Sequence, residues 1–589
     1  MTSDPPADAT DEPTSDPEAL RLDGGTATGA DEVVLDPWGS ATVGDYEELF
    51  TQFGIEEFDE ILPDVADPHY LMRRGVIFGH REYDRVVEAL REDEPAAALS
   101  GFMPTGDPHI GHKLVFDEII WHQEQGADAY GLIADLEAHA ARRLSWSEID
   151  EHARDYLLSL LALGFDPEEG ELYRQSTNRD VQDLAFELGA KANFSEMQAI
   201  YDFDGETDVS HMESVLTQMA DILYPQLEEP KPTVIPVGPD QDPHMRLARD
   251  LAARMRYFGV TEAYSSYEVT DNMRRCIEWL YQEVERSFID GLGEESHGVS
   301  AYLNNSQAAV LLRSLRKYLV ESEQPEADEI EIDIEELAQL DNYDHTETEL
   351  EKVVNELIPF STFPPDVFSD NLTDALLRRF TSAKREPLRP RVRFLDRNAT
   401  DEAFEALIEA VDGEKRVYDA HVDAFDLSVG EAEDLAREIE VEHGGYGFVP
   451  PSSIYHRFMT GLTGGKMSSS VPASHISLLD DPEEGYNKVK AATTGGRETA
   501  ELQRELGGEP DDCPVYELYT YLLAADDDAF ATRVYEECAG GERLCGDCKE
   551  QAARLMEEFL EEHQEKREEA KEVLAEADVD LDVAEKRRG

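Results

Sequence analysis

Basic residues, cysteines and long apolar runs are all scarce in this chain of 589 residues. No stretch of roughly eighteen consecutive apolar residues occurs, so no membrane-spanning helix is predicted. The N-terminal sequence MTSDPPADATDEPTSDPEA is acidic and has no apolar core, so no secretory signal is predicted. The five cysteines are too few for a disulfide scaffold. We therefore expect a cytoplasmic protein without a membrane anchor.

The charge of the chain is strongly acidic, because 52 lysines and arginines face 131 aspartates and glutamates, for a formal net charge of −79. An acidic interaction tail would concentrate this charge in one segment, whereas adaptation to high salt spreads it over many helix faces. The acidic residues are spread, as in 152–171, 434–445 and 557–570. We interpret the charge as halophilic adaptation, in which salt screens self-repulsion. It does not exclude binding to a nucleic acid.

An alternation of strand and helix patterns over residues 95–259 predicts an α/β fold with a Rossmann-like parallel-sheet catalytic domain. The runs at 96–102, 127–136 and 232–238 have the character of buried strands, and 109–125 that of a helix ended by glycine. Ligands of such sheets bind at the carboxyl ends of the strands. We therefore look for the active site at the junctions that follow these strands.

The rest of the chain divides by composition and pattern. A length of 589 residues suits roughly two to four domains. We predict a disordered acidic tail over 1–30, an N-terminal extension over 31–94, the first part of the catalytic domain over 95–259, an inserted acidic, helix-rich domain over 260–445, a loop-rich return to the catalytic domain over 446–480, and a helical domain over 481–589.

The first motif is PTGDPHIGH, at residues 104–112. Asp107 and Pro108 begin a triplet, Asp-Pro-His, that Asp242 and Pro243 begin again at a second strand-to-helix junction. Aspartate is a good N-cap and proline favours the first helical position. Each triplet therefore predicts a helix start, and capping alone is the simplest explanation of these residues.

The histidines of this motif require more than capping. His109 and His112 are three residues apart in a first helical turn, and Gly111 between them leaves the backbone accessible. The free N–H groups and the dipole of a helix N-terminus attract anions, which favours contact with phosphate. A zinc site is less favoured, because the helical zinc motif places its histidines four residues apart around a glutamate. Ordinary packing is the remaining alternative.

The second motif is LTGGKMSSS, at residues 462–470. Two glycines followed by Lys466 and three hydroxyls supply flexibility, one point charge and several donors, which suits a loop that grips phosphate. The spacing is not that of a P-loop. Taken alone, this motif would also be compatible with a flexible linker.

Together, HIGH at 109–112 and KMSSS at 466–470 resemble the paired motifs of class I aminoacyl-tRNA synthetases. The resemblance implies that they stabilise the α-phosphate and departing pyrophosphate of ATP, with Mg²⁺ on the phosphates. It implies catalytic roles for His109, His112, Lys466, Ser468 and Ser470, and ATP contacts from Pro104, Thr105, Gly106, His109, Ile110, Gly111, His112, Lys466, Met467, Ser468, Ser469 and Ser470.

Further motifs narrow this resemblance to tryptophanyl-tRNA synthetases of the archaeal and eukaryotic type. They are DQDPH at 240–244, GGRET at 495–499, LGG at 506–508, EFLEEHQEKR at 558–567, VLDPWG at 34–39 and MRRGVIFGHRE at 72–82. The resemblance implies a tryptophan–tRNA ligase, which makes tryptophanyl-adenylate from L-tryptophan and ATP and then esterifies tRNA(Trp). It also implies an anticodon-binding role for the C-terminal helices and a homodimer.

The same resemblance assigns the amino-acid site. Glu137 and Gln218 would hold the tryptophan ammonium group, and Gln241 would contact the indole N–H, since a buried N–H without a partner is costly. Leu99 occupies the place where eukaryotic relatives have a tyrosine that binds the indole. Asp221 lies where tyrosyl enzymes accept a phenol hydroxyl, so a tyrosyl-tRNA synthetase is the nearest alternative.

Four of the five cysteines have the spacing C-x24-C-x6-C-x2-C. Four thiolates suit either zinc or a 4Fe–4S cluster, and some bacterial tryptophanyl-tRNA synthetases carry such a cluster on similar spacing. We prefer the cluster to zinc, with free thiols as the alternative. The residues concerned are Cys513, Cys538, Cys545 and Cys548.

Two other classes of function remain possible. A non-catalytic paralogue that binds tRNA or amino acid could keep this fold, and the acidic insertion is the feature that suggests it. A nucleotidyltransferase that makes a small cofactor could share the HIGH motif. The intact histidines, lysine and serines argue against the first, and the DQDP element and C-terminal helices against the second.

Overall fold

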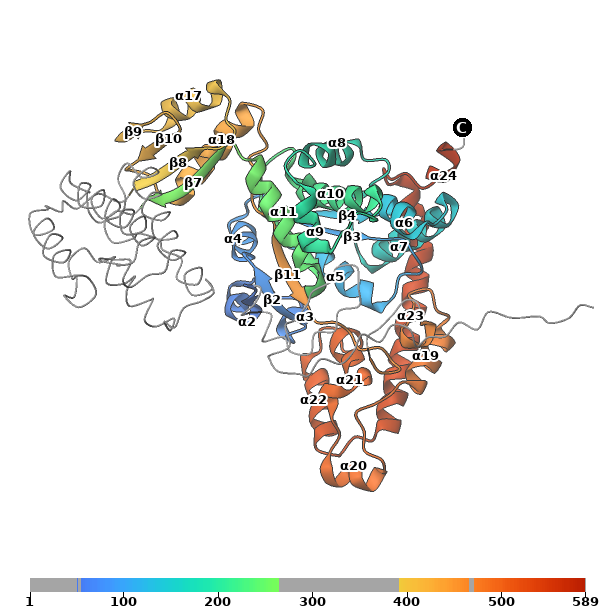
Figure 1. The fold of residues 1–589 in the computed structure, drawn as a ribbon. Coiled ribbons are helices and arrows are strands. Elements are labelled where there is room, and N and C mark those ends of the chain that lie inside the picture. Colours follow the sequence, from blue (N-terminus) through green and yellow to red (C-terminus); the bar gives the residue numbers. More distant parts are fainter. Residues whose placement is uncertain (1–49, 51–53, 264–390, 466–470, 588–589) are drawn as a thin grey trace, which may run out of the picture.

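The fold is described from a computed structural model, which covers residue 50 and residues 54–263, 391–465 and 471–587 (Figure 1). The predicted acidic tail, much of the predicted insertion and Lys466, Met467, Ser468, Ser469 and Ser470 lie outside these described residues. In the part that is described, no helix is both long and apolar enough to cross a membrane.

A seven-stranded sheet forms the centre of the molecule. Five of its strands are parallel, and β1 and β2 add an antiparallel edge. This arrangement confirms the predicted Rossmann-like sheet. The strands follow the order β1 (Glu56–Glu57), β2 (Ile77–Arg81), β11 (Ser452–His456), β6 (Thr233–Val237), β3 (Ala97–Phe102), β4 (Asp128–Ile133) and β5 (Gly170–Arg174).

Side chains of the central strands alternate between two apolar cores, one on each face of the sheet. On β3, Ala98 and Phe102 enter one core and Leu99 the other; on β6, Val234 and Ile235 divide in the same way. Helices cover both faces (Figure 1). They are α2 (Phe58–Ile61), α3 (Tyr70–Arg73), α4 (Asp84–Glu92), α5 (Ile110–Glu124), α6 (Asp135–Arg142), α7 (Trp146–Leu163), α8 (Arg179–Leu188), α9 (Phe194–Tyr201), α10 (Val209–Leu223) and α11 (Asp242–Met255).

The described part of the predicted insertion is a small layer of its own. Helices were expected there and two are present, but an antiparallel four-stranded sheet, which the sequence analysis missed, packs against them. Its strands are short: Val392 and Phe394 alternate with charged arginines, a weak signal in so acidic a segment. The elements are β7 (Phe258–Ala263), β8 (Arg391–Asp396), β10 (His421–Ala424), β9 (Lys415–Val417), α17 (Asp401–Ala410) and α18 (Val429–Glu442).

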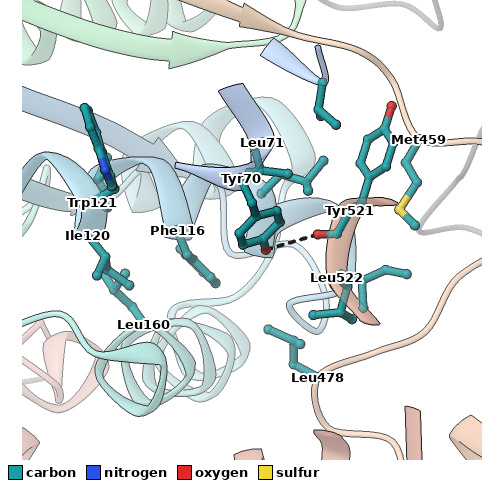
Figure 2. Close-up of a cluster of buried hydrophobic side chains, with 14 of the residues drawn as sticks. Tyr70, Leu71, Phe116, Ile120, Trp121, Leu160, Met459, Leu478, Tyr521 and Leu522 are labelled. Carbon is teal, nitrogen blue, oxygen red and sulfur yellow. Dashed lines mark hydrogen bonds between the residues drawn. The ribbon is translucent and has the colours of Figure 1, made fainter. Parts of the chain in front are cut away.

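The C-terminal region is helical, as predicted, and shares an apolar core with the catalytic domain. Figure 2 shows Tyr70 beside Tyr521 of this region, and the Tyr70 hydroxyl donates to the Tyr521 carbonyl over 3.2 Å. The long helix α23 packs along both α7 and α19. The helices are α19 (Pro482–Ala491), α20 (Ala500–Leu506), α21 (Pro514–Leu518), a π-helix (Tyr519–Leu523), α22 (Asp528–Ala539), α23 (Cys545–Glu576) and α24 (Val583–Lys586).

Candidate active site

The HIGH histidines cap the helix that they begin. Helix α5 starts at Ile110, and the Nδ1 atom of its N-cap His109 accepts from the Gly111 backbone N–H over 3.1 Å. In return, Nδ1 of His112 accepts from the His109 N–H, also over 3.1 Å. Two donors that a helix leaves unsatisfied are thereby paired. The prediction that Asp107 caps this helix is wrong, because the chain stays extended through His109, with φ −132°.

The second Asp-Pro-His triplet behaves differently. Helix α11 begins at Asp242 itself, with Pro243 in its first turn, and Asp242 makes no side-chain cap. Its carboxylate instead pairs with Arg81 over 2.7 Å and accepts from the Tyr455 hydroxyl over 2.6 Å. The predicted helix start is therefore confirmed, whereas the predicted capping role of Asp242 is wrong. Asp242 thus links helix α11 to strands β2 and β11 beside the cavity.

Both HIGH histidines are neutral at physiological pH. Burial lowers the pKa of His109 far below its ordinary value and lowers that of His112 to about 4. Because each Nδ1 accepts a backbone N–H, each ring carries its proton on Nε2. Nε2 of His112 lies 3.2 Å from the Tyr156 hydroxyl. The pair therefore offers hydrogen-bond donors rather than cations or metal ligands.

The segment that follows the second motif lies against the first. The Ile110 N–H donates to the Ile476 carbonyl over 3.1 Å, and the Leu478 N–H donates to the Pro108 carbonyl over 2.9 Å. The rings of His109 and His475 are 5.2 Å apart. Backbone pairing thus joins two segments that are more than 360 residues apart in the chain, and it brings the flank of KMSSS to HIGH.

A cavity of about 520 Å³ opens at the carboxyl ends of β3, β4 and β6, a typical size for a small-molecule site. Its wall contains predicted residues from both halves of the site: His109, Gly111, His112, Glu137, Gln218 and Gln241, together with Leu99. The other predicted ATP contacts among the described residues do not line it. Pro104, Thr105 and Gly106 lie in the loop between β3 and α5, and the Ile110 side chain is buried in the core.

Three side chains, Glu137, Gln175 and Asp221, form what we call the polar floor of the cavity. Nε2 of Gln175 donates to Oε1 of Glu137 over 2.9 Å and to Oδ2 of Asp221 over 2.6 Å. The Tyr173 hydroxyl donates to the other Asp221 oxygen over 3.0 Å. Burial raises the pKa of Glu137 to about 7 and that of Asp221 well above its ordinary value. The floor is therefore a buried, carboxyl-rich surface whose burial opposes ionisation.

Amides and a histidine complete the wall opposite the HIGH helix. Gln218 lies one helical turn before Asp221 on α10 and is half-buried in the wall. Nε2 of Gln241 lies 3.4 Å from Oδ2 of Asp240. His244 is held by the Tyr201 hydroxyl, 2.8 Å from its Nδ1, and burial lowers its pKa to about 3. These uncharged groups suit the recognition of a polar but compact ligand.

The sequence analysis missed two members of the site. Gln175 directly follows β5, and Glu137 lies in α6, the helix after β4, so a polar residue at the carboxyl end of the next parallel strand was an available signal. His456, at the end of β11, lines the cavity with its Nδ1 3.6 Å from the buried carboxylate of Glu118 on α5. The sequence carried no signal for that pair, because it depends on strand order.

The four predicted cysteines lie close together at the N-terminal end of α23. Cys513, Cys538, Cys545 and Cys548 line one small cavity. Two glycines of the GGRET and LGG motifs give their sulfurs room: a Cβ on Gly496 would lie 2.3 Å from the Cys545 sulfur, and one on Gly508 would lie 2.7 Å from the Cys538 sulfur. Side chains larger than hydrogen at these glycines would therefore fill the space of the thiols.

The four sulfurs do not form a ready-made zinc site. Tetrahedral zinc with bonds of ~2.3 Å needs sulfurs about 3.8 Å apart. Among the described residues, only Asp107, His152 and Asp155 place three potential ligand atoms within 4.8 Å of one another. No three of the four sulfurs are therefore that close, and zinc would require them to move together.

The parallel sheet, the histidine cap at its carboxyl edge and the KMSSS flank paired to that cap define a class I synthetase catalytic domain. A family model described as tRNA synthetases class I (W and Y) matches residues 91–270 and 429–561, more than half of the chain. The chain belongs to this family.

Two relatives that match over nearly the whole chain are tryptophan–tRNA ligases. The tryptophan–tRNA ligase 1 of Halobacterium salinarum is 62% identical over 94% of this chain and 98% of its own length. That of Methanosarcina acetivorans is 41% identical over 92% of this chain and 98% of its own length. The crystal structure of tryptophanyl-tRNA synthetase from Aeropyrum pernix is 29% identical, with a TM-score of 0.56, and the match covers 93% of this chain and 99% of that one.

Proposed function

We propose that the protein is a tryptophan–tRNA ligase. It joins L-tryptophan to ATP, releasing pyrophosphate, and then transfers tryptophan from the adenylate to the terminal adenosine of tRNA(Trp). The observation that carries the proposal is the 62% identity to a tryptophan–tRNA ligase over 94% of the chain. The cavity supports it, because the HIGH pair and the predicted amino-acid residues share one wall.

Adenylate formation needs positioning and charge stabilisation rather than a nucleophilic side chain, since the amino-acid carboxylate itself attacks the α-phosphate. The Nε2–H groups of His109 and His112 are preorganised donors for the charge that develops there. Lys466, Ser468 and Ser470 would add further donors. Mg²⁺ would bridge the phosphate oxygens, a role for which it needs few protein ligands.

Tryptophan would lie across the polar floor. Glu137 and Gln218 hold the ammonium group, and Gln241 faces the indole. Asp221 is a second acceptor for the indole N–H, buried more deeply than Gln241 and positioned by Tyr173. It takes over the function that Leu99, on β3, cannot supply. A phenol could also donate to Asp221, so tyrosine is the substrate to test against.

The remaining partners follow the family. The helical region over 481–587 binds the anticodon arm of tRNA, and the chain works as a homodimer in the cytoplasm. The spread of acidic residues keeps it soluble at high salt, where an excess of charge is screened.

The four cysteines hold a 4Fe–4S cluster in this proposal. The donor set supports it, because four thiols line one small cavity and two glycines lie against their sulfurs. When bound, the cluster would cross-link α22, α23 and the loop at Cys513. Anaerobically purified protein should show broad visible absorbance with iron and sulfide in equal amounts; protein with neither iron nor zinc contradicts a metal centre.

The function is tested by amino-acid-dependent ATP–pyrophosphate exchange in molar KCl, with tryptophan and tyrosine side by side. Exchange with tryptophan supports the proposal. Exchange with tyrosine alone would replace it by a tyrosyl enzyme. Exchange with neither, in protein shown to be folded, would favour the non-catalytic paralogue.

A further inference from the structure

We propose that Gln175 is a specificity-determining residue of the amino-acid site. Its amide oxygen accepts a hydrogen bond from the ammonium group of the bound amino acid, and its amide nitrogen keeps Glu137 and Asp221 apart as two separate acceptors. The inference rests on the proposed function, because it assumes an amino acid in the cavity. It adds an ammonium contact that neither the motifs nor the comparisons assign.

The orientation of the Gln175 amide follows from its surroundings. Both neighbours of Nε2 are carboxyl groups, Glu137 at 2.9 Å and Asp221 at 2.6 Å. When both carboxyls are ionised, as in a complex with an ammonium group, they only accept; the flipped amide would then place Oε1 against two acceptors, so the nitrogen is fixed on the carboxyl side. Oε1 must then point elsewhere. It is buried, and no partner among the described residues donates to it.

An acceptor without a donor at the wall of a cavity calls for a ligand. Buried polar atoms are nearly always paired, and each exception needs an explanation, such as a catalytic role or a partner that binds later. Gln175 is fully buried and lines the cavity together with Glu137 and Gln218. A primary ammonium group carries three donors, and these three side chains offer one acceptor each. The stoichiometry fits an amino acid better than a ligand with a single N–H.

The backbone around Gln175 is held firmly. Its N–H donates to the Ile133 carbonyl over 3.2 Å, and its carbonyl accepts from Gln182 Nε2 over 2.8 Å. The preceding residue, Arg174, is fully buried between Asp135 at 2.8 Å and Asp150 at 2.7 Å. Gln175 therefore presents Oε1 at a fixed position, which is what selective recognition of a small cation requires.

The position of Gln175 divides the floor by chemistry. On one side, Glu137 and the Gln175 oxygen face a positive group. On the other, Asp221 and Tyr173 face a neutral donor of the ligand side chain. The division predicts that changes at Gln175 weaken ammonium recognition more than side-chain recognition, whereas changes at Tyr173 act through Asp221 on the side chain.

The test compares two ligands that differ only in the ammonium group, L-tryptophan and indole-3-propionate, by calorimetric titration in molar KCl. For Gln175→Leu we expect tryptophan affinity to fall roughly tenfold to a hundredfold, the cost of an unpaired buried group, and indole-3-propionate affinity to fall by a smaller factor, because that ligand loses only the support that Gln175 gives to Asp221. For Tyr173→Phe, the matched control on the preceding strand, we expect both affinities to fall by the same factor.

Equal loss of both ligands in Gln175→Leu, or no loss of either, would overturn the inference. If that variant does not fold, as judged by circular dichroism, Gln175→Met keeps the length of the side chain and serves in its place. Failure of the proposed function is recognised separately, because wild-type protein would then show no tryptophan-dependent exchange. If the wild-type protein shows exchange but the Gln175 variant loses both ligands equally, only the role proposed for Gln175 is wrong.

Discussion

The imidazole of His456 lies 3.6 Å from the carboxylate of Glu118, and neither oxygen of that carboxylate has a hydrogen-bond partner among the described residues. Glu118 is 1% exposed and burial raises its pKa, although His456 opposes the shift. A carboxyl with a raised pKa stabilises the fold below its unfolded pKa of about 4.5, and this contribution is lost as pH rises. At neutral pH, the buried Glu118 carboxylate therefore lowers the free energy of unfolding.

Glu118→Gln should therefore stabilise the protein at pH 8 by about 1 to 2 kcal/mol, because it removes a buried charge without hydrogen bonds. Denaturant unfolding in molar KCl measures the change. Glu124→Gln, exposed on the same helix, is the control and should shift stability by less than about 0.5 kcal/mol. Destabilisation by Glu118→Gln would mean that the His456 ion pair outweighs the burial.

His109→Ala and His112→Ala should each cost about 2 to 4 kcal/mol in the exchange reaction, as for removal of one oxyanion donor. Because both rings are already neutral, the rate should show no titration of these groups between pH 6 and pH 8. Initial rates at saturating tryptophan, corrected for folded fraction, measure this. His139→Ala, exposed on α6, is the control. Full activity in both variants would refute their role.

Lys466→Ala should reduce exchange by a similar amount, while leaving tryptophan affinity unchanged, because the lysine acts on the phosphates. The measurement pairs exchange rates with calorimetric titration of tryptophan alone. A loss of tryptophan affinity equal to the loss of rate would indicate a structural role instead.

Tryptophan binding should strengthen as pH rises through about 7. The Glu137 carboxyl, whose pKa burial raises to about 7, must lose its proton to pair with the ammonium group. The same shift means that Glu137 stabilises the fold below pH ~4.5 and that this contribution is lost as pH rises through about 7. Titration from pH 5.5 to pH 8.5 measures the affinity, and in Glu137→Gln the slope should disappear. A slope that survives belongs to another group.

Gly496→Ala should destabilise the C-terminal region by about 1 to 3 kcal/mol and lower its iron content, because the added methyl would overlap the Cys545 sulfur. Gly546→Ala, at the start of α23, meets no atom within 4 Å and is the matched control. Thermal unfolding and iron analysis are measured on both variants. Equal iron content in the two variants would show that Gly496 is not needed for metal binding.

Sequence predicted the local elements well and the pairings poorly. The strand of Leu99 and the HIGH helix were found because apolar periodicity and glycine ends are local signals. The capping role of Asp107 failed, because the backbone at His109 stays extended and the histidine itself serves as cap. Gln175 was missed although it directly follows a strand. Its contacts with Glu137 and Asp221 exist only because β5 lies beside β4 in the sheet.

The cysteine spacing shows the same limit from the other side. A gap of 24 residues separates Cys513 from Cys538, and no local pattern brings them together. The packing of the helical region does so, and it also places Gly496 and Gly508 against the sulfurs. Recognition of the family supplied the cluster hypothesis, and the physical reason for the glycine motifs became visible only in the fold.

Helix α23 spans 32 residues, about 48 Å, and the chain beyond it returns to the catalytic domain. There the Asp580 carbonyl accepts from Arg174 over 3.1 Å and the Ala584 N–H donates to Asp150 over 2.8 Å. A protein truncated at residue 579 would keep every residue that lines the cavity. It would lose one of the three acceptors of the buried Arg174 guanidinium, and Arg174 directly precedes Gln175. The C-terminal segment thus helps to hold Arg174 and Asp150 in place behind the amino-acid site. We expect a tag or a deletion at that end to lower the affinity for tryptophan.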